Sequence, residues 1–143
     1  MRVTHQIVYS SKANRRMSVS DLEEILVDAR TGNEARNVTG ALVYVDGVFL
    51  QILEGEKETL QGLMRSIAAD TRHSSVTVFH EADVERPLFS DWRMAYVGAK
   101  PEQMAVWAGL EGTASIDTIL QGVRREPQRT PRMLEHILQT LAR

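Results

Sequence analysis

One segment of this 143-residue chain is apolar on both of its faces, and it constrains the fold more than any other feature. Residues 48–53 consist mainly of β-branched and large apolar residues, a composition typical of a strand. Side chains alternate along a strand, which places Phe49, Gln51 and Leu53 on one face and Leu50 and Ile52 on the other. Such a strand needs a layer of structure on each side of its sheet.

The other elements alternate between strands and helices. Residues 38–45 and 48–53 flank the dipeptide Asp46-Gly47, which predicts a hairpin with a two-residue turn. Apolar patterning predicts further strands at residues 3–9, 76–82 and 92–97, and amphipathic helices at residues 20–31 and 60–68. The resulting order, βαββαββ, is the ferredoxin-like motif with an additional strand, in which one sheet carries both helices on one face.

Local signals predict where the helices begin and end. Ser20 with Glu23 forms a capping-box pattern, and Gly32-Asn33 is expected to stop the first helix. In the tail, one short helix is expected near residues 116–123, and another has Thr130 as its N-cap and Pro131 as its first residue.

We expect the tail helices to cover the open face of the sheet. The predicted fold class is therefore α+β, a five-stranded mixed sheet with two helices on one face and C-terminal helices on the other. The predicted organisation is a domain at residues 1–97 followed by a helical extension at residues 98–143.

Composition excludes several functional classes. The net charge of −2 and the pI of about 6.1 give no electrostatic reason to expect nucleic acid or an anionic membrane as partner. The absence of cysteine excludes disulfides and thiolate chemistry, and no apolar run approaches the length of a membrane helix. The four histidines lack metal-like spacing, so no metal site is predicted. We expect a cytoplasmic protein.

Gln51 is the first anomaly. It shares its strand face with Phe49 and Leu53, so its amide should point toward the core, where an unpartnered polar group costs about 1–3 kcal/mol. The first and third strands of a ferredoxin-like sheet are neighbours, and Tyr9 ends the first strand on the side of Ile7. Tyr9 and Gln51 could therefore simply satisfy each other at a strand end, and the spacing alone identifies no cofactor.

Five blocks of residues occur in the order typical of one family. They are Val8-Tyr9-Ser10, Asn33 with Val38-Thr39-Gly40, the run from Gly47 to Gly55, Asp70 with Arg72-His73, and Phe89 with Trp92-Arg93-Met94. With these blocks the chain resembles the BLUF family of blue-light sensors. The resemblance covers residues 3–97, and the F-x-Q-x-L-E-G pattern within the third block is its most specific part.

The resemblance implies a function that is not enzymatic. BLUF domains hold FAD between the two helices, and their photochemistry depends on a tyrosine and a glutamine that match Tyr9 and Gln51. In the family, blue light makes the tyrosine give up an electron and a proton transiently. The glutamine then rotates or tautomerises, which rewires the hydrogen bonds to the flavin.

The resemblance also implies which residues surround FAD. Asn33 matches an asparagine that bonds the polar edge of the flavin ring, and it could also cap the first helix, because an asparagine can serve in both roles at once. Ile25 and Leu53 would wall the ring, or would be ordinary core residues. The remaining cofactor-binding positions implied are Asp70, Arg72 and His73, which could instead only complete the end of the second helix. Ser66 departs from the family, because some members carry a basic residue there.

Trp92 and Met94 match the family pair that relays the glutamine change, and their spacing predicts that they share a face of the last strand. Which of the two lies beside Gln51 is left open. We expect the tail to receive the signal and pass it to an unidentified protein partner, and we expect a homo-oligomer.

Two alternative functions are an acylphosphatase-like enzyme, although the phosphate-binding loop of such enzymes is missing here, and a light-insensitive module that binds a small molecule or a protein.

Overall fold

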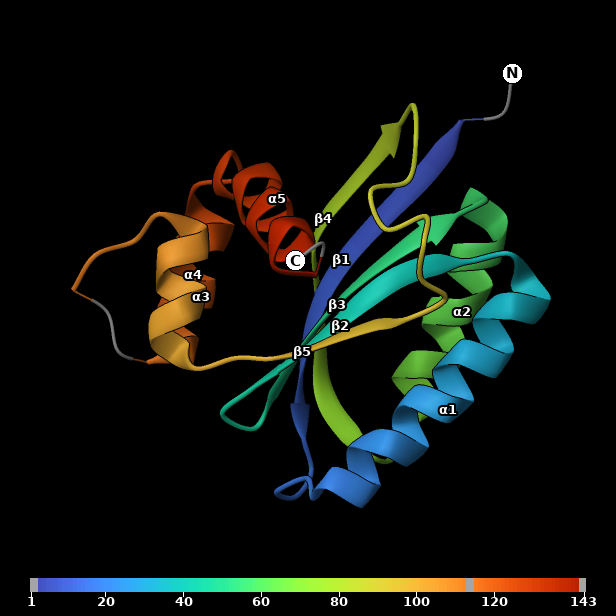
Figure 1. Ribbon diagram of the computed structural model, residues 1–143, viewed down its shortest axis with the longest axis horizontal. Coiled ribbons are helices and arrows are strands. Elements are labelled where there is room, and N and C mark those ends of the chain that lie inside the picture. The colour runs from blue at the N-terminus through green and yellow to red at the C-terminus, as the bar shows by residue number, and fades with distance from the viewer. Residues whose placement is uncertain (1–2, 113–114, 142–143) are drawn as a thin grey trace.

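A five-stranded sheet with helices on both faces forms the centre of the molecule (Figure 1). The computed structural model describes residues 3–112 and 115–141. The strands are β1 (Thr4–Ala13), β2 (Thr39–Val45), β3 (Val48–Gly55), β4 (His73–Val84) and β5 (Ala95–Gly98). The helices are α1 (Val19–Arg36), α2 (Lys57–Ala69), α3 (Pro101–Ala108), α4 (Ile116–Arg125) and α5 (Arg129–Leu141). The predicted order βαββαββ and the α+β class are confirmed.

The strand order is β4-β1-β3-β2-β5, so β1 and β3 are neighbours as predicted. They run antiparallel, with Tyr9 directly opposite Gln51, whereas β2 and β5 run parallel and make the sheet mixed. The hairpin between β2 and β3 turns at Asp46 and Gly47, whose φ angles are 48° and 79°. Two consecutive left-handed residues are what a two-residue turn of this type requires, and aspartate followed by glycine tolerates them well.

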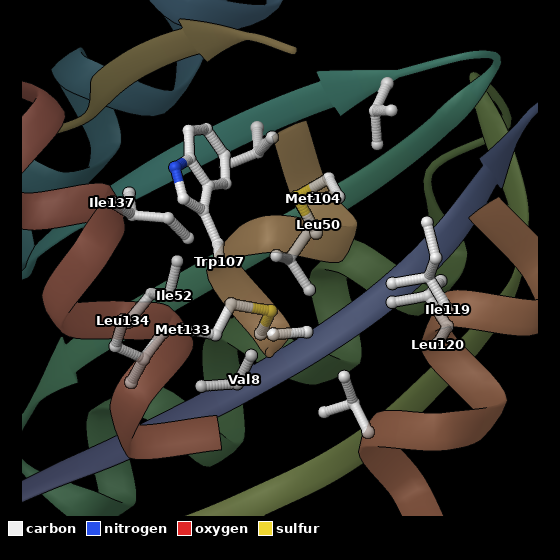
Figure 2. Close-up of a cluster of buried hydrophobic side chains, with 14 of the residues drawn as sticks. Val8, Leu50, Ile52, Met104, Trp107, Ile119, Leu120, Met133, Leu134 and Ile137 are labelled. Atoms are coloured by element: carbon white, nitrogen blue, oxygen red, sulfur yellow. The ribbon is translucent and has the colours of Figure 1, made fainter. Parts of the chain in front are cut away.

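The two faces of the sheet carry separate apolar cores. We name the face that carries α1 and α2 the helix-pair face, and the face covered by α3, α4 and α5 the tail face. On the helix-pair face, Ile7, Phe49 and Leu53 pack with α1 and α2. On the tail face, the side chains of β1, β2 and β3 meet those of α3, α4 and α5 (Figure 2), including Val8, Leu50, Ile52, Met104, Trp107, Ile119, Leu134 and Ile137. The prediction that the tail covers the open face of the sheet is therefore confirmed, and β3 is apolar on both sides for this reason.

The predicted ends of α1 are wrong at both termini. Ser18, not Ser20, is the N-cap, and it exchanges hydrogen bonds with Asp21 in place of the expected glutamate. The helix continues through Gly32-Asn33 to Arg36 and ends at Asn37, which adopts a left-handed φ of 56°. A glycine inside a helix costs only about 1 kcal/mol, and the tertiary contacts of the last turn outweigh it.

The C-terminal part also differs from the prediction. The last strand begins at Ala95 and not at Trp92, and α5 begins at Arg129, ahead of the predicted cap at Thr130. The helix α3 was not predicted, because its first residue is Pro101 and proline more often interrupts regular structure than begins it. Proline is well suited to the first helical position, since it lacks only an N–H that has no intrahelical partner there. The N-cap here is Lys100, whose N–H donates to Gln103 Oε1.

The connection between β4 and β5 spans the whole sheet. These two strands lie at opposite edges, so residues 85–94, which we name the crossing segment, pass over the ends of the central strands (Figure 1). Phe89 is fully buried in the tail-face core, whereas Met94 belongs to the core of the helix-pair face. The crossing segment therefore contacts both faces of the sheet.

Candidate functional site

A cavity of about 310 Å³ opens between α1, α2 and the helix-pair face of the sheet. Seven of the eight predicted cofactor-binding residues line it, namely Tyr9, Ile25, Asn33, Gln51, Asp70, Arg72 and His73. The eighth, Leu53, is fully buried in the core of the same face. Residues from four elements and the turn after α2 converge on this one space.

Tyr9 and Gln51 meet at the base of this cavity, on adjacent strands. The Tyr9 hydroxyl donates a hydrogen bond to Gln51 Oε1, and Gln51 Nε2 lies 3.6 Å from Met94 Sδ, to which it donates. Both side chains are buried, with 3% of Tyr9 and 8% of Gln51 exposed. The amide is thus held on both sides, and Met94, not Trp92, is its neighbour.

Burial keeps the Tyr9 phenol protonated. Removal of the ring from water raises the pKa of Tyr9 above its ordinary value, and the negative charge of Asp70 raises it further. A phenolate at this position would be poorly solvated. Tyr9 therefore remains a hydrogen-bond donor across the physiological pH range.

Asn33 lies in the last two turns of α1 and is not a helix cap. Its side chain is buried, and Nδ2 donates to the Arg93 carbonyl at 2.6 Å. One turn earlier on the same helix, Arg30 Nε donates to the Met94 carbonyl at 3.0 Å. Two α1 side chains therefore hold the end of the crossing segment beside the cavity. From the sequence, the spacing of three residues between Arg30 and Asn33 predicts that they share a face of the helix. Only the tertiary structure shows that this face contacts the crossing segment.

Charged residues close one side of the cavity. Arg72 contacts Asp70 at 2.6 Å and reaches Asp28 of α1 at 3.0 Å, so it connects the turn after α2 with the facing helix. Hydrogen bonding from Arg72 lowers the pKa of Asp70, and the same bond raises that of Arg72. Asp28 was missed from sequence because nothing in α1 distinguishes it from other exposed carboxylates.

His73 begins β4 and joins it to the end of α2. Its Nε2 lies 2.6 Å from the Ile67 carbonyl, and its Nδ1 lies 2.7 Å from Ser11 Oγ. A carbonyl only accepts, so Nε2 carries the hydrogen and the Ser11 hydroxyl can donate to Nδ1. The bond from His73 Nε2 to the Ile67 carbonyl lies in the last turn of α2. It fits the alternative given above, in which His73 completes the end of the second helix.

The lining of the cavity matches a flat aromatic ligand with a polar edge. Aliphatic side chains of the two helices, Ile25 and Leu63 among them, face each other across it, and Phe49 contributes from the sheet. Polar groups with both donors and acceptors gather on the sheet side and at the mouth. A space of this size and mixed lining falls in the range of small-molecule sites, and the tricyclic ring of a flavin fits its character.

Trp92 and Met94 do not share a face, contrary to the expectation from their spacing. Trp92 packs against the tail-face core and Met94 against the helix-pair core. The physical reason is that they precede β5 and lie in the crossing segment, where strand alternation does not apply. A second feature missed from sequence is Glu54, whose buried carboxylate on β3 accepts hydrogen bonds from the crossing segment.

Both ring nitrogens of His5, at the start of β1, contact carboxylates of β4. His5 is buried, and its two ring nitrogens each lie 2.9 Å from a carboxylate, of Asp83 and of Glu81. These carboxylates lie on opposite sides of the ring and do not converge on one point. Within residues 3–112 and 115–141, no cluster of three potential ligands is placed to hold a metal ion, and no helix is long and apolar enough to cross a membrane.

Comparison with known families gives a match over most of the chain. Residues 4–95 match the sequence model of BLUF, described as sensors of blue-light using FAD. Photoactivated adenylate cyclase subunit beta of Euglena gracilis is 34% identical over 110 residues, which are 76% of this chain. The corresponding subunit of Euglena longa is 36% identical over 110 residues. The chain spans only 13% of the length of either relative.

Solved structures show the same fold, including the tail. The structure described as the BlsA photo-activated state is 26% identical, with a TM-score of 0.80, and the alignment covers 94% of each chain. The structure of BlrB, described as a BLUF protein in its dark state, is 24% identical with a TM-score of 0.77 and aligns over 97% of this chain and 98% of its own. A bacterial light-regulated adenylyl cyclase aligns over 96% of this chain but only 36% of its own, with a TM-score of 0.64.

Proposed function

Because this chain belongs to the BLUF family, the sensors of blue light that use FAD, we propose that Tyr9, Gln51 and Met94 form its light-driven switch. The observation that carries this proposal is the continuous hydrogen-bonded path from the Tyr9 hydroxyl through the Gln51 amide to Met94 Sδ at the base of the cavity. A path of this kind can exist in two arrangements, because an amide has a donor end and an acceptor end.

The cavity residues have separate roles in holding FAD. Ile25 and Leu63 would flank the ring from the two helices, and Asn33 would bond its polar edge. Arg72 would contribute a donor at the side near the turn after α2, His73 would line that side with its ring, and Leu53 would support the wall from within the core. When bound, the flavin supplies blue-light absorption and an excited state that accepts an electron.

Tyr9 is suited to a transient loss of an electron and a proton together. Its raised pKa prevents loss of the proton alone, whereas a phenol that loses an electron becomes a strong acid. Gln51 Oε1 is the acceptor in contact with the hydroxyl, so the proton has a short path onto the amide. Return of both particles to Tyr9 restores the phenol, and no substrate is consumed.

The transfer of an electron and a proton from Tyr9 is brief, and a changed hydrogen-bond arrangement of Gln51 would outlast it. Protonation of the amide oxygen permits tautomerisation or rotation, after which the group that faced Tyr9 no longer presents the same acceptor. Met94 Sδ is a weak acceptor, so its contact with Nε2 costs little to break. The rearranged amide would bond the flavin more strongly and shift its absorption to the red.

The signal would leave through the tail. We propose that residues 1–97 act as the sensor and residues 98–143 as the output element, since Trp92 of the crossing segment packs on the tail-face core. Some relatives are photoactivated cyclases, which supports transmission of a light signal to an effector. For this chain we propose a separate protein partner and self-association as the route.

An absorption spectrum before and after blue light tests the proposal. We expect a flavin spectrum that shifts slightly to the red, by an energy of about 1 kcal/mol that one strengthened hydrogen bond contributes, and that relaxes in the dark. Heat-released cofactor should co-migrate with FAD in chromatography. A protein that stays colourless after incubation with FAD would contradict the proposal and favour a light-insensitive binding module.

A further inference from the structure

Glu54 is a buried carboxylate on the tail face of β3, three residues beyond Gln51 on the same strand. Only 1% of it is exposed, yet among the described contacts it faces no cation. A buried charge is costly unless hydrogen bonds satisfy it, and here four donors do so. Each carboxylate oxygen accepts two of them.

The four donors come in two matched pairs. Two come from the neighbouring strands, with Gln6 Nε2 at 3.1 Å from Oε2 and Thr39 Oγ1 at 3.3 Å from Oε1. The other two are main-chain amides of the crossing segment, with Leu88 N at 2.6 Å from Oε2 and Phe89 N at 2.8 Å from Oε1. Bonds from N–H groups to a carboxylate are among the stronger hydrogen bonds in proteins, and the amide pair is the shorter of the two pairs.

The other end of the crossing segment is also fixed. The carbonyl of Trp92 accepts from Gly40 N at 3.2 Å, and the carbonyls of Arg93 and Met94 accept from Asn33 and Arg30 of α1. Between these contacts and the Glu54 carboxylate, the segment has little freedom. The strand that carries the Gln51 amide thus also carries the anchor of the segment that delivers Met94 to it.

We propose that Glu54 is a positioning residue for the light switch, which holds the crossing segment on β3 so that Met94 Sδ returns to Gln51 Nε2. This inference rests on the proposed function of Tyr9, Gln51 and Met94. Glu54 takes no part in the photochemistry, because its carboxylate lies on the opposite face of the sheet. It acts by fixing one end of the segment while the other end responds to Gln51.

Glu54→Gln tests this role with little change in shape. One oxygen becomes an NH₂ group, which cannot accept, so one strand donor and one crossing-segment amide lose their acceptor. Thr39→Val is the matched control, because it removes one strand donor from the same carboxylate and leaves both amide contacts intact. Dark recovery after blue light and the ¹³C-methyl resonance of Met94, assigned with Met94→Leu, are measured in both variants.

We expect Glu54→Gln to bind FAD, to move the Met94 methyl resonance in the dark, and to slow recovery about fivefold. That factor corresponds to about 1 kcal/mol, the net value of one hydrogen bond. Thr39→Val should leave the resonance and the recovery rate unchanged. Recovery and a Met94 resonance in Glu54→Gln that match the unsubstituted protein, with only the melting temperature lowered, would overturn the proposal and make Glu54 purely structural.

The methyl resonance separates this inference from the proposed function. If the unsubstituted protein showed no photocycle, the proposed function would fail, and the dark spectrum alone would still decide whether Glu54 positions Met94. If Glu54→Gln did not fold, Glu54→Asp would serve, since its shorter side chain keeps the charge but cannot reach both amides. A Met94 resonance unmoved in Glu54→Asp would count against the proposal.

Discussion

The two faces of one sheet are built from the same strands but differ in what they bury. The apolar core of the tail face consists of aliphatic and thioether side chains together with Phe89 and Trp107, many of which Figure 2 shows. The buried polar side chains of that face include Gln6 and Glu54, which are hydrogen-bonded to each other. The helix-pair face buries Tyr9 and Gln51 at the base of a cavity of about 310 Å³. Adjacent residues of β3 therefore serve opposite purposes. Leu50 and Ile52 pack against the tail, and Gln51 between them supplies the polar group that we propose to rearrange.

The contrast between the two faces suggests how one sheet can carry a rigid core on one side and a proposed light-driven switch on the other. Dense apolar packing tolerates little rearrangement, because any shift opens a void or forces an overlap. On the helix-pair face, the Gln51 amide lies beside a cavity and has one donor end and one acceptor end, which is why we propose that it can exchange one hydrogen-bond arrangement for another. The tail face would then register the change made on the helix-pair face. Each of the following tests changes one face and compares it with the other.

The largest expected effect follows from removing the polar group at the base of the cavity on the helix-pair face. Gln51→Leu keeps the bulk of the side chain and removes the amide, so it should retain flavin but lose the light-induced red shift completely. Difference spectra before and after blue light measure this. Ile52→Leu, a change at the next residue on the opposite face, should keep the full shift. A normal photocycle in Gln51→Leu would show that the amide is not the switch.

A change in the tail-face core should lower the stability of the fold and leave the photochemistry intact. Leu134 is 1% exposed, so Leu134→Ala should lower the free energy of unfolding by about 3 kcal/mol through lost burial and the void it leaves, with the red shift retained. Leu63→Ala, on the cavity wall, should reduce stability less and weaken flavin binding more. Urea unfolding and flavin titration measure the two effects. Equal losses of stability would contradict the contrast between the faces.

The smallest effect concerns pH and the Tyr9 phenol. Its pKa is raised in the folded protein above the ordinary value of 10.0, so from pH 10 upward the unfolded chain loses this proton first. The stability contributed by Tyr9 is therefore complete below pH 10 and is lost above it, by about 1.4 kcal/mol for each pH unit.

Tyr9→Phe is the control for this titration. Urea unfolding at pH 9, 10 and 11 should show a steeper loss of stability for the unsubstituted protein than for Tyr9→Phe. Tyr96, whose pKa is also raised by burial, is present in both proteins and does not contribute to the difference. An identical pH dependence of the two proteins would mean that the Tyr9 phenol is not buried as the structure indicates.

Much of the fold could be predicted because its signals are local. The turn residues Asp46-Gly47 and the alternation along residues 48–53 predict the hairpin and its two buried faces without any tertiary information. The errors fall where tertiary contacts override local preference. Gly32-Asn33 did not end α1, because the buried Asn33 side chain bonds Arg93 across the fold, and Pro101 started a helix in place of ending a strand.

The candidate site shows the same division between local and tertiary information. The sequence by itself determined that Gln51 lies on the face of Phe49 and Leu53, because side-chain alternation is a property of any strand. Only the tertiary structure decided that Met94, not Trp92, reaches Gln51, and that Glu54 holds the segment that delivers it. The crossing segment has no regular period, so its side chains are placed by contacts with strands and helices far away in sequence.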